Sequence, residues 1–122
     1  MKIIYLFIIL FTIILCISCT DSEEDPVISC ETEKPFEDIA WLKKLKTDFD
    51  NDSSATKRKI TQYNYKGKTV YMIQYCFGCA DSMATVYDCD KNEVCLFGGY
   101  GGFNTCPDFN KQATNKKILW EN

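Results

Sequence analysis

The sequence predicts a small α+β domain in which one N-terminal amphipathic helix packs on an antiparallel sheet of four to five strands, stapled by disulfides. Three observations lead to this prediction. Apolar residues recur at helical spacing from Phe36 to Phe49, residues 59–75 are rich in β-branched and aromatic residues, and six cysteines follow an export signal and its lipidation site. An apolar stripe on a helix is what covers one face of a sheet.

The first 18 residues have the pattern of a signal peptide. Lys2 is the only charged residue before Asp21, and a mostly apolar run follows it as far as Leu15. This run is shorter than the roughly 20 apolar residues that a transmembrane helix needs. We therefore expect residues 1–18 to be a lipoprotein signal peptide that is removed on export.

Cys19 is the predicted site of lipidation. In a bacterial lipoprotein signal a small residue directly precedes the cysteine that becomes lipidated; Ser18 meets this requirement, whereas Leu15 before Cys16 is too large. Palmitate and similar chains on Cys19 would anchor the protein without a membrane span, because each buried CH₂ contributes about 0.8 kcal/mol. The alternative is an ordinary secretory signal that leaves no lipid.

Residues 19–34 are predicted to be the lipidated cysteine and an acidic, flexible tether. Four acids at Asp21, Glu23, Glu24 and Asp25 would be repelled by anionic lipids. The same run resembles the acidic tag of Bacteroidota surface lipoproteins, which is a second interpretation. We expect an exported protein anchored at the outer membrane, either facing the periplasm or exposed at the cell surface.

Residues 35–122 are expected to form a single disulfide-rich domain. In a small exported domain cysteines are usually paired. The candidates for disulfide bonds are Cys30, Cys76, Cys79, Cys89, Cys95 and Cys106. We expect Cys95 to pair with Cys106 and Cys30 to pair with Cys76 or Cys79.

The helix should begin at Pro35, whose ring presets φ for a first turn, with Glu37 and Asp38 at the positive end of the helix dipole. A break near Ala40, giving a short turn and a helix from Trp41, is the alternative. The apolar stripe consists of Phe36, Ile39, Leu42, Leu45 and Phe49.

Two hairpins and a final strand should follow the helix. The expected strands are residues 59–65 and 69–75, joined by Lys66-Gly67, then residues 84–89 and 94–97, and finally residues 117–120. A two-residue turn would set Cys89 opposite Val94, whereas a three-residue turn would set it opposite Cys95. The partner of Cys89 therefore stays open.

Composition excludes several functions. The chain has no His, which excludes Ser-His-Asp and Cys-His catalysis. Its net charge of −3 includes no basic surplus for nucleic acid. Cys76-Phe77-Gly78-Cys79 follows a predicted strand instead of beginning a helix, and it lacks a second ligand pair for zinc, so structural cysteines are favoured over redox or metal chemistry. We predict no catalytic residue, no metal site and no cofactor.

The glycine-rich segment at residues 98–103 is the candidate binding loop. It lacks the Gly-Lys-Ser/Thr of a phosphate loop. A mobile linker is one interpretation. The other is a recognition loop in which Tyr100 and Phe103 offer aromatic contact at small entropic cost.

Residues 35–120 resemble an uncharacterised domain family of small Bacteroidota lipoproteins. The resemblance rests on Trp41-Leu42-Lys43, on Tyr63 to Tyr71, on Tyr87-Asp88-Cys89-Asp90, on Cys106-Pro107-Asp108-Phe109 and on Lys117 to Trp120. It implies a lipid-anchored, cysteine-rich domain without an assigned activity. The chain departs from the pattern at Cys76 to Cys79, where adjacent cysteines are expected.

The leading functional hypothesis is a non-enzymatic extracytoplasmic binding module, held to the membrane by its lipid and binding an unknown protein or glycan. Two alternatives remain. One is a proteinase-inhibitor-like module that presents residues Gly98–Thr105. The other is a thiol-disulfide oxidoreductase that uses Cys76 and Cys79.

Overall fold

A computed structural model describes residues 30–122. The predicted signal peptide, the lipidation site Cys19 and most of the predicted tether lie outside the described residues. Among residues 30–122 no helix has the length and apolarity that a membrane crossing requires.

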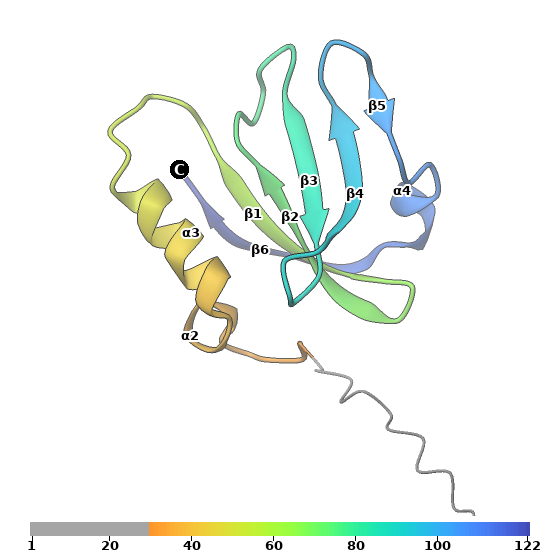
Figure 1. Cartoon of the computed structure of the whole chain (residues 1–122), viewed down its shortest axis with the longest axis horizontal. Helices are drawn as coiled ribbons and strands as arrows, with labels where there is room; N and C mark the ends of the chain where they lie inside the picture. Colours follow the sequence, from red (N-terminus) through yellow and green to blue (C-terminus); the bar gives the residue numbers. More distant parts are fainter. Residues whose placement is uncertain (1–29) are drawn as a thin grey trace, which may run out of the picture.

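A six-stranded antiparallel sheet forms the body of the domain, with strand order β5-β4-β3-β2-β1-β6 (Figure 1). The strands are β1 (Lys59–Tyr65), β2 (Lys68–Gln74), β3 (Met83–Tyr87), β4 (Glu93–Gly98), β5 (Phe103–Asn104) and β6 (Thr114–Glu121). Consecutive strands from β1 to β5 lie side by side. The last strand, β6, returns to pair with β1, so the C-terminus lies beside the first strand.

The predicted fold class is wrong. The described chain is mostly sheet, with six strands and only short helices: α2 (Pro35–Asp38), α3 (Ala40–Asp50) and α4 (Phe109–Gln112). The long helix fails at Ile39, whose extended backbone (φ −108°, ψ 101°) separates α2 from α3. The sheet is larger because β5 adds an edge strand and β6 has eight residues, where four were expected.

One face of the sheet carries the first core. Leu42 and Phe49 of α3 pack on Ile60, Tyr71 and Ile73 of β1 and β2, and all five side chains are buried. The helix therefore contributes one apolar face, as its three- and four-residue spacing requires.

Trp41 closes this core beside β3. Its ring meets those of Tyr71 and Tyr87 edge to face, with centroids 6.1 and 5.7 Å away. Its indole Nε1–H donates a 2.7 Å hydrogen bond to the carbonyl oxygen of Cys89. The helix is thereby attached to the turn that follows β3.

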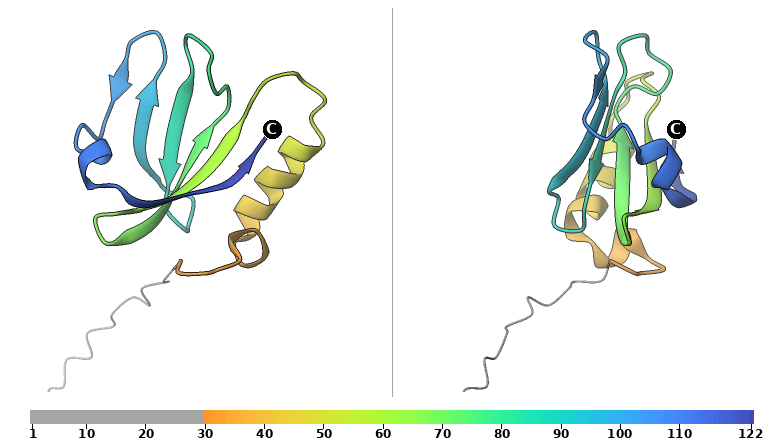
Figure 2. Two further views of the ribbon diagram at one scale, coloured as in Figure 1. Left: turned by 180° about the vertical axis from the view of Figure 1, so that it is seen from behind. Right: turned by 90° about the vertical axis from the view of Figure 1, so that its right-hand side faces the viewer.

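The opposite face has a second core around Phe109 of α4. Its ring centroid lies 5.3 Å from that of Tyr63, 4.9 Å from that of Tyr65 and 5.3 Å from that of Phe97. Because side chains alternate along a strand, these rings point away from α3. Figure 2 shows α3 and α4 on opposite sides of the sheet.

Three disulfides join Cys30 to Cys89, Cys76 to Cys79 and Cys95 to Cys106, with Cα atoms 5.8, 5.6 and 5.6 Å apart. The expected Cys95–Cys106 pair is present. The expected partner of Cys30 is wrong: the β2–β3 hairpin places Cys76 and Cys79 at one end of the sheet and Cys89 at the other, where Cys30 lies. Cys30 is buried, although the sequence placed it in the tether.

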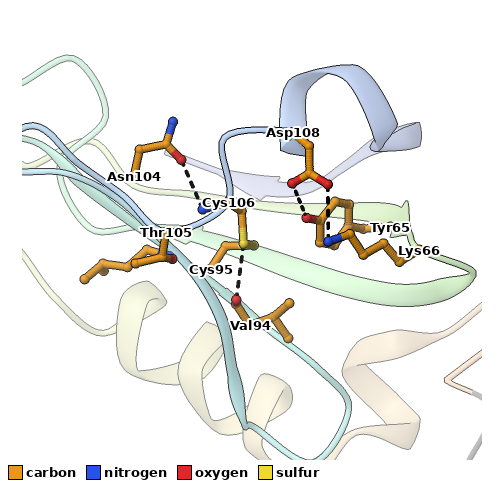
Figure 3. Close-up of a disulfide and its surroundings, with 9 residues drawn as sticks. Tyr65, Lys66, Val94, Cys95, Asn104, Thr105, Cys106 and Asp108 are labelled. Atoms are coloured by element: carbon orange, nitrogen blue, oxygen red, sulfur yellow. Dashed lines mark hydrogen bonds and ion pairs between the residues drawn. A yellow bond between two sulfur atoms is a disulfide. The ribbon is translucent and has the colours of Figure 1, made fainter.

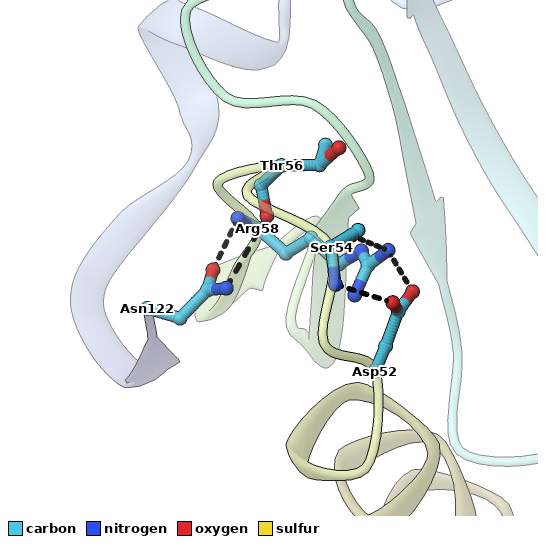
Figure 4. A network of polar contacts seen from close by, with 5 residues as sticks. All are labelled: Asp52, Ser54, Thr56, Arg58 and Asn122. Carbon is cyan, nitrogen blue, oxygen red and sulfur yellow. Dashed lines mark hydrogen bonds and ion pairs between the residues drawn. The ribbon is translucent and has the colours of Figure 1, made fainter.

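A polar network fastens the C-terminus to the segment between α3 and β1 (Figure 4). The side chain of Asn122 accepts a 2.6 Å hydrogen bond from the backbone N–H of Arg58 and donates one of 3.2 Å to the carbonyl oxygen of Thr56. The Arg58 guanidinium donates to Asp52 and Ser54. The pKa of Asp52 is lowered by the Ser54 backbone N–H and by Arg58.

Candidate binding edge

Large apolar side chains are exposed at one end of the sheet. β2 ends and β3 begins there, and in the adjacent antiparallel hairpin β4 ends and β5 begins there. In the register, Met83 pairs with Gly98, and Gly98 pairs with Phe103. The loops after β2 and β4 lie together along the upper side of Figure 1. We call this surface the apolar edge; it comprises Tyr75, Phe77, Met83, Tyr100 and Phe103.

Tyr100 is the most exposed of these residues, with 98% of its surface accessible, and Phe103 follows with 57%. The other three are exposed by 40–45%. Tyr75 rests partly on the first core, because its ring lies edge to face against Phe49 with centroids 5.7 Å apart. Burial raises the pKa of Tyr75, and the neighbouring Tyr87 raises it further.

The loop between β2 and β3 is held by backbone contacts and by the Cys76–Cys79 disulfide. The N–H of Phe77 donates a 2.7 Å hydrogen bond to the carbonyl of Lys57. The Phe77 ring lies under the ammonium of Lys59, which is 3.6 Å from the ring centroid. Lys59 also pairs with Glu121 at 3.1 Å, so Phe77 is fixed against β1 and β6.

The glycine loop, residues 98–102, packs directly against the loop after β2. Gly98 has φ +90°, and a Cβ placed on it would lie 2.0 Å from the carbonyl oxygen of Ser82. The N–H of Gly99 donates a 3.2 Å hydrogen bond to the same oxygen. Only glycine allows this approach with this backbone conformation.

Tyr100 stands at the tip of a tight turn. The N–H of Gly102 donates a 3.0 Å hydrogen bond to the carbonyl of Gly99, which closes the turn around Tyr100. The ring of Phe103 packs against this turn, with an atom 3.2 Å from the position that a Cβ on Gly101 would take. In this conformation the loop therefore forms a hydrogen-bonded turn that presents Tyr100.

The base of the hairpin is fixed by the Cys95–Cys106 disulfide (Figure 3). Beside it, the backbone N–H of Leu96 donates a 2.8 Å hydrogen bond to Thr105 Oγ1, and the N–H of Thr105 donates one of 3.1 Å to the carbonyl of Leu96. Constraints at the base and at the Ser82 contact leave little freedom in the hairpin between them.

The chain after this hairpin is held by Asp108, whose carboxylate faces both Tyr65 and Lys66 in Figure 3. The Tyr65 hydroxyl donates a 2.7 Å hydrogen bond to Asp108, and Lys66 pairs with it at 3.2 Å. Both contacts lower the pKa of Asp108, the Tyr65 hydroxyl most. Between Glu93 and Asp108 the sequence has no charged residue, so this hairpin offers apolar contact and backbone hydrogen bonds but no ion pair.

Residues 47–122 match a family described as a domain of unknown function, DUF6970. The chain belongs to this family. The DUF6970 segment begins within α3 and includes all six strands, so the whole apolar edge lies inside it. No curated protein and no solved structure matches the chain.

The DUF6970 domain brings the predicted loop residues Tyr100 and Phe103 together with the Cys76–Cys79 disulfide. Cys30, Cys89, Cys95 and Cys106 form the other two bridges, away from the tip of the loop. Tyr75, Phe77 and Met83 were not predicted as site residues from the sequence. Apolar residues at or near the strand ends that flank the Cys76–Cys79 turn were the signal that could have identified them.

The described part of the DUF6970 chain has no group of three or more cysteine or acidic side chains that could hold a metal ion. A polar hollow of about 310 Å³ lies at the other end of the sheet, where Gln62 and Asn64 face Glu31 and Glu33. The Oε1 atom of Gln62 is buried there and accepts no hydrogen bond from the described residues. This hollow is separate from the apolar edge.

Proposed function

We propose that this DUF6970 protein is a lipid-anchored, non-enzymatic binding module of the bacterial cell envelope, and that the apolar edge is its binding surface. The observation that carries the proposal is the exposure of five large apolar side chains at one end of a disulfide-linked sheet. Small monomeric domains rarely expose such groups together unless a partner covers them. A fixed backbone loses little conformational entropy on binding, which favours affinity.

The anchoring part of the proposal rests on the sequence. Lys2, the apolar run and Ser18-Cys19 have the order of a lipoprotein signal, and the resemblance to small Bacteroidota lipoproteins agrees with an outer-membrane location. The disulfide with Cys89 holds Cys30 near the C-terminal end of β3, whereas Met83 lies at the N-terminal end of this strand. A tether that ends at residue 30 would therefore present the apolar edge away from the membrane.

The two alternative functions have less support. A protease inhibitor offers an extended segment to its enzyme, but Tyr100 lies in a turn closed by Gly102 and Gly99. A thioredoxin-type cysteine needs a helix N-terminus to lower its pKa. In the described chain Cys76 follows the end of β2 and no helix begins there.

Binding is tested with the exported, processed full chain and two double variants of matched polarity. Tyr100→Ser/Phe103→Ser alters the apolar edge, whereas Val94→Ser/Ile118→Ser removes two exposed apolar side chains outside the apolar edge. Immobilised outer-membrane protein and an array of neutral glycans are the probes. We expect the first variant to lose at least about tenfold in affinity, since central aromatic residues dominate binding energies, and the second to bind like the wild type. Equal binding by both variants would contradict the proposal.

The anchor is tested separately by mass spectrometry of the N-terminal peptide. A diacyl or triacyl group on Cys19 is expected, and Cys19→Ala should release the protein into the soluble fraction. A mature N-terminus elsewhere, without lipid, would refute the anchoring part and leave the binding part standing.

A further inference from the structure

We propose that the Cys76–Cys79 disulfide is a reducible latch that holds the glycine loop, and with it Tyr100, in the conformation that binds. The latch would regulate the apolar edge, so the inference rests on the proposed function. It follows from the accessibility of this disulfide, from the short loop that it closes and from a series of hydrogen bonds that leads from it to the glycine loop.

The Cys76–Cys79 disulfide is the most accessible of the three. Cys30 and Cys95 are buried, so each of the other two bridges has one sulfur inside a core. Cys76 is only partly buried and Cys79 is exposed. Because exchange requires a thiolate to reach a disulfide sulfur, a reductant meets this bridge first.

Reduction of this bridge alone should leave the fold intact. Its cysteines are separated by 3 positions, against 11 for Cys95–Cys106 and 59 for Cys30–Cys89. The stabilisation that a disulfide gives by restricting the unfolded chain grows with the length of the loop that it closes. The shortest loop therefore contributes least to global stability, and no core residue belongs to it.

Three backbone hydrogen bonds connect the disulfide with the glycine loop. The N–H of Cys79 donates to the carbonyl of Cys76 at 3.3 Å, and the N–H of Ser82 donates to the carbonyl of Cys79 at 3.2 Å. The N–H of Gly99 then donates to the carbonyl of Ser82 at 3.2 Å. The disulfide fixes the first turn of this series, and the position of the Ser82 carbonyl decides where the glycine loop can lie.

The chemical step is a thiol-disulfide exchange with a dithiol. A thiolate of the dithiol attacks the exposed Cys79 Sγ, the bond between the two cysteine sulfurs breaks, and Cys76 leaves as a thiolate that takes up a proton. The second thiol of the reductant, after losing its proton, attacks the mixed disulfide and releases Cys79, which is protonated in turn. The protein gains two electrons and two protons, and the dithiol becomes a disulfide.

The test treats the lipidated full chain with increasing dithiothreitol, alkylates the free thiols and maps them by mass spectrometry. Cys76 and Cys79 should be alkylated at a dithiol concentration at least tenfold below that needed for the other four cysteines. Amide exchange at Gly99 and Gly102, whose N–H groups are hydrogen-bonded in the glycine loop, should then rise at least tenfold, while exchange in β1 stays unchanged. A Cys76→Ser/Cys79→Ser variant should reproduce this exchange pattern without reductant.

Two results would overturn the latch: simultaneous reduction of the three bridges, or slow, unchanged exchange at Gly99 and Gly102 after Cys76 and Cys79 are reduced. These readouts need no binding partner, so they are independent of the proposed function. If the Tyr100→Ser/Phe103→Ser variant binds outer-membrane protein normally, the regulatory role fails together with the proposed function. If that variant loses binding but the reduced wild type does not, the latch alone fails.

Discussion

At the scale of single residues, Tyr71 is completely buried although its hydroxyl lacks a hydrogen-bond partner among the described residues. Its ring is fully buried between β2 and α3, where Trp41 contacts it edge to face. Burial raises the pKa of Tyr71 to about 12, because the phenolate would lose its hydration. The ring stabilises the core, whereas the hydroxyl opposes its formation.

Tyr71→Phe should therefore stabilise the protein by about 1 kcal/mol at pH 7, since it removes a buried, unpaired hydroxyl. The unfolded Tyr71 ionises near pH 10 and the folded one near pH 12. The unfolded state thus loses its proton first, and stability falls as the pH rises from 10 to 12. The variant should lose less stability in this range.

Urea denaturation at pH 7, 9, 10 and 11 measures this difference. Part of the alkaline loss should remain in Tyr71→Phe, because burial also raises the pKa of Tyr63 and Tyr75. If the free energy of unfolding falls equally in the wild type and the variant above pH 10, Tyr71 does not titrate as expected.

At the scale of elements, the β4–β5 hairpin depends on one glycine more than on the others. Gly98 and Gly67 both have positive φ, +90° and +77°, but only Gly98 faces a close neighbour, the Ser82 carbonyl. Gly67 has no atom within 4 Å of its would-be Cβ. Alanine substitutions at Gly67 and Gly98 therefore separate two free-energy penalties: that of placing alanine at positive φ, and that of its clash with the Ser82 carbonyl.

Gly67→Ala should cost about 1 kcal/mol, the penalty for a left-handed alanine. Gly98→Ala should cost about 2 kcal/mol more, because the hairpin must also move away from Ser82. Thermal or urea denaturation gives both values, and amide exchange at Gly99 should accelerate only in Gly98→Ala. Equal losses in the two variants would mean that the Ser82 contact does not restrain the hairpin.

Short-range patterns predicted the elements that depend on neighbours in the chain. Lys66-Gly67 between two β-rich stretches indicated the β1–β2 hairpin, which is present. β6 was underestimated because residues 114–116 are polar and their strand conformation comes from pairing with β1, about 50 residues earlier. The break near Ala40, the alternative to one long helix, is confirmed at Ile39; periodicity alone does not reveal it, because the apolar stripe continues across it.

The candidate site was likewise predictable only where its residues are neighbours in the sequence. Tyr100 and Phe103 were identified because glycines surround them in the sequence. Phe77 and Met83 join them only because antiparallel pairing brings separate turns to one end of the sheet. The partner of Cys30 was missed for the same reason, since it depends on which end of β3 meets the start of the domain.

At the scale of the whole molecule, two small cores lie on opposite faces of one sheet, and each contains one disulfide, Cys30–Cys89 in the first and Cys95–Cys106 in the second. Cys30–Cys89 connects the start of the described chain with the β3–β4 turn and encloses both α2 and α3. Cys95–Cys106 closes a shorter loop that contains the β4–β5 hairpin. The first bridge should therefore restrict the unfolded chain more than either of the other two does.

Cys30→Ala/Cys89→Ala should lower the free energy of unfolding by about 4 kcal/mol, and Cys76→Ala/Cys79→Ala by about 2 kcal/mol, from the lengths of the loops that they open. Calorimetry and urea denaturation of the oxidised variants test this order. A reversed order would show that native contacts around each bridge outweigh the effect on the unfolded chain.

The position of Cys30–Cys89 also determines how the protein would bear mechanical force. If the chain is pulled at its N-terminal side while a partner holds the apolar edge, tension enters at Cys30 and crosses the disulfide to Cys89. It then runs along β3 to Met83, parallel to the strand and across its hydrogen bonds with β2 and β4. The load bypasses α2 and α3, so the helices can stay folded while the sheet resists in shear.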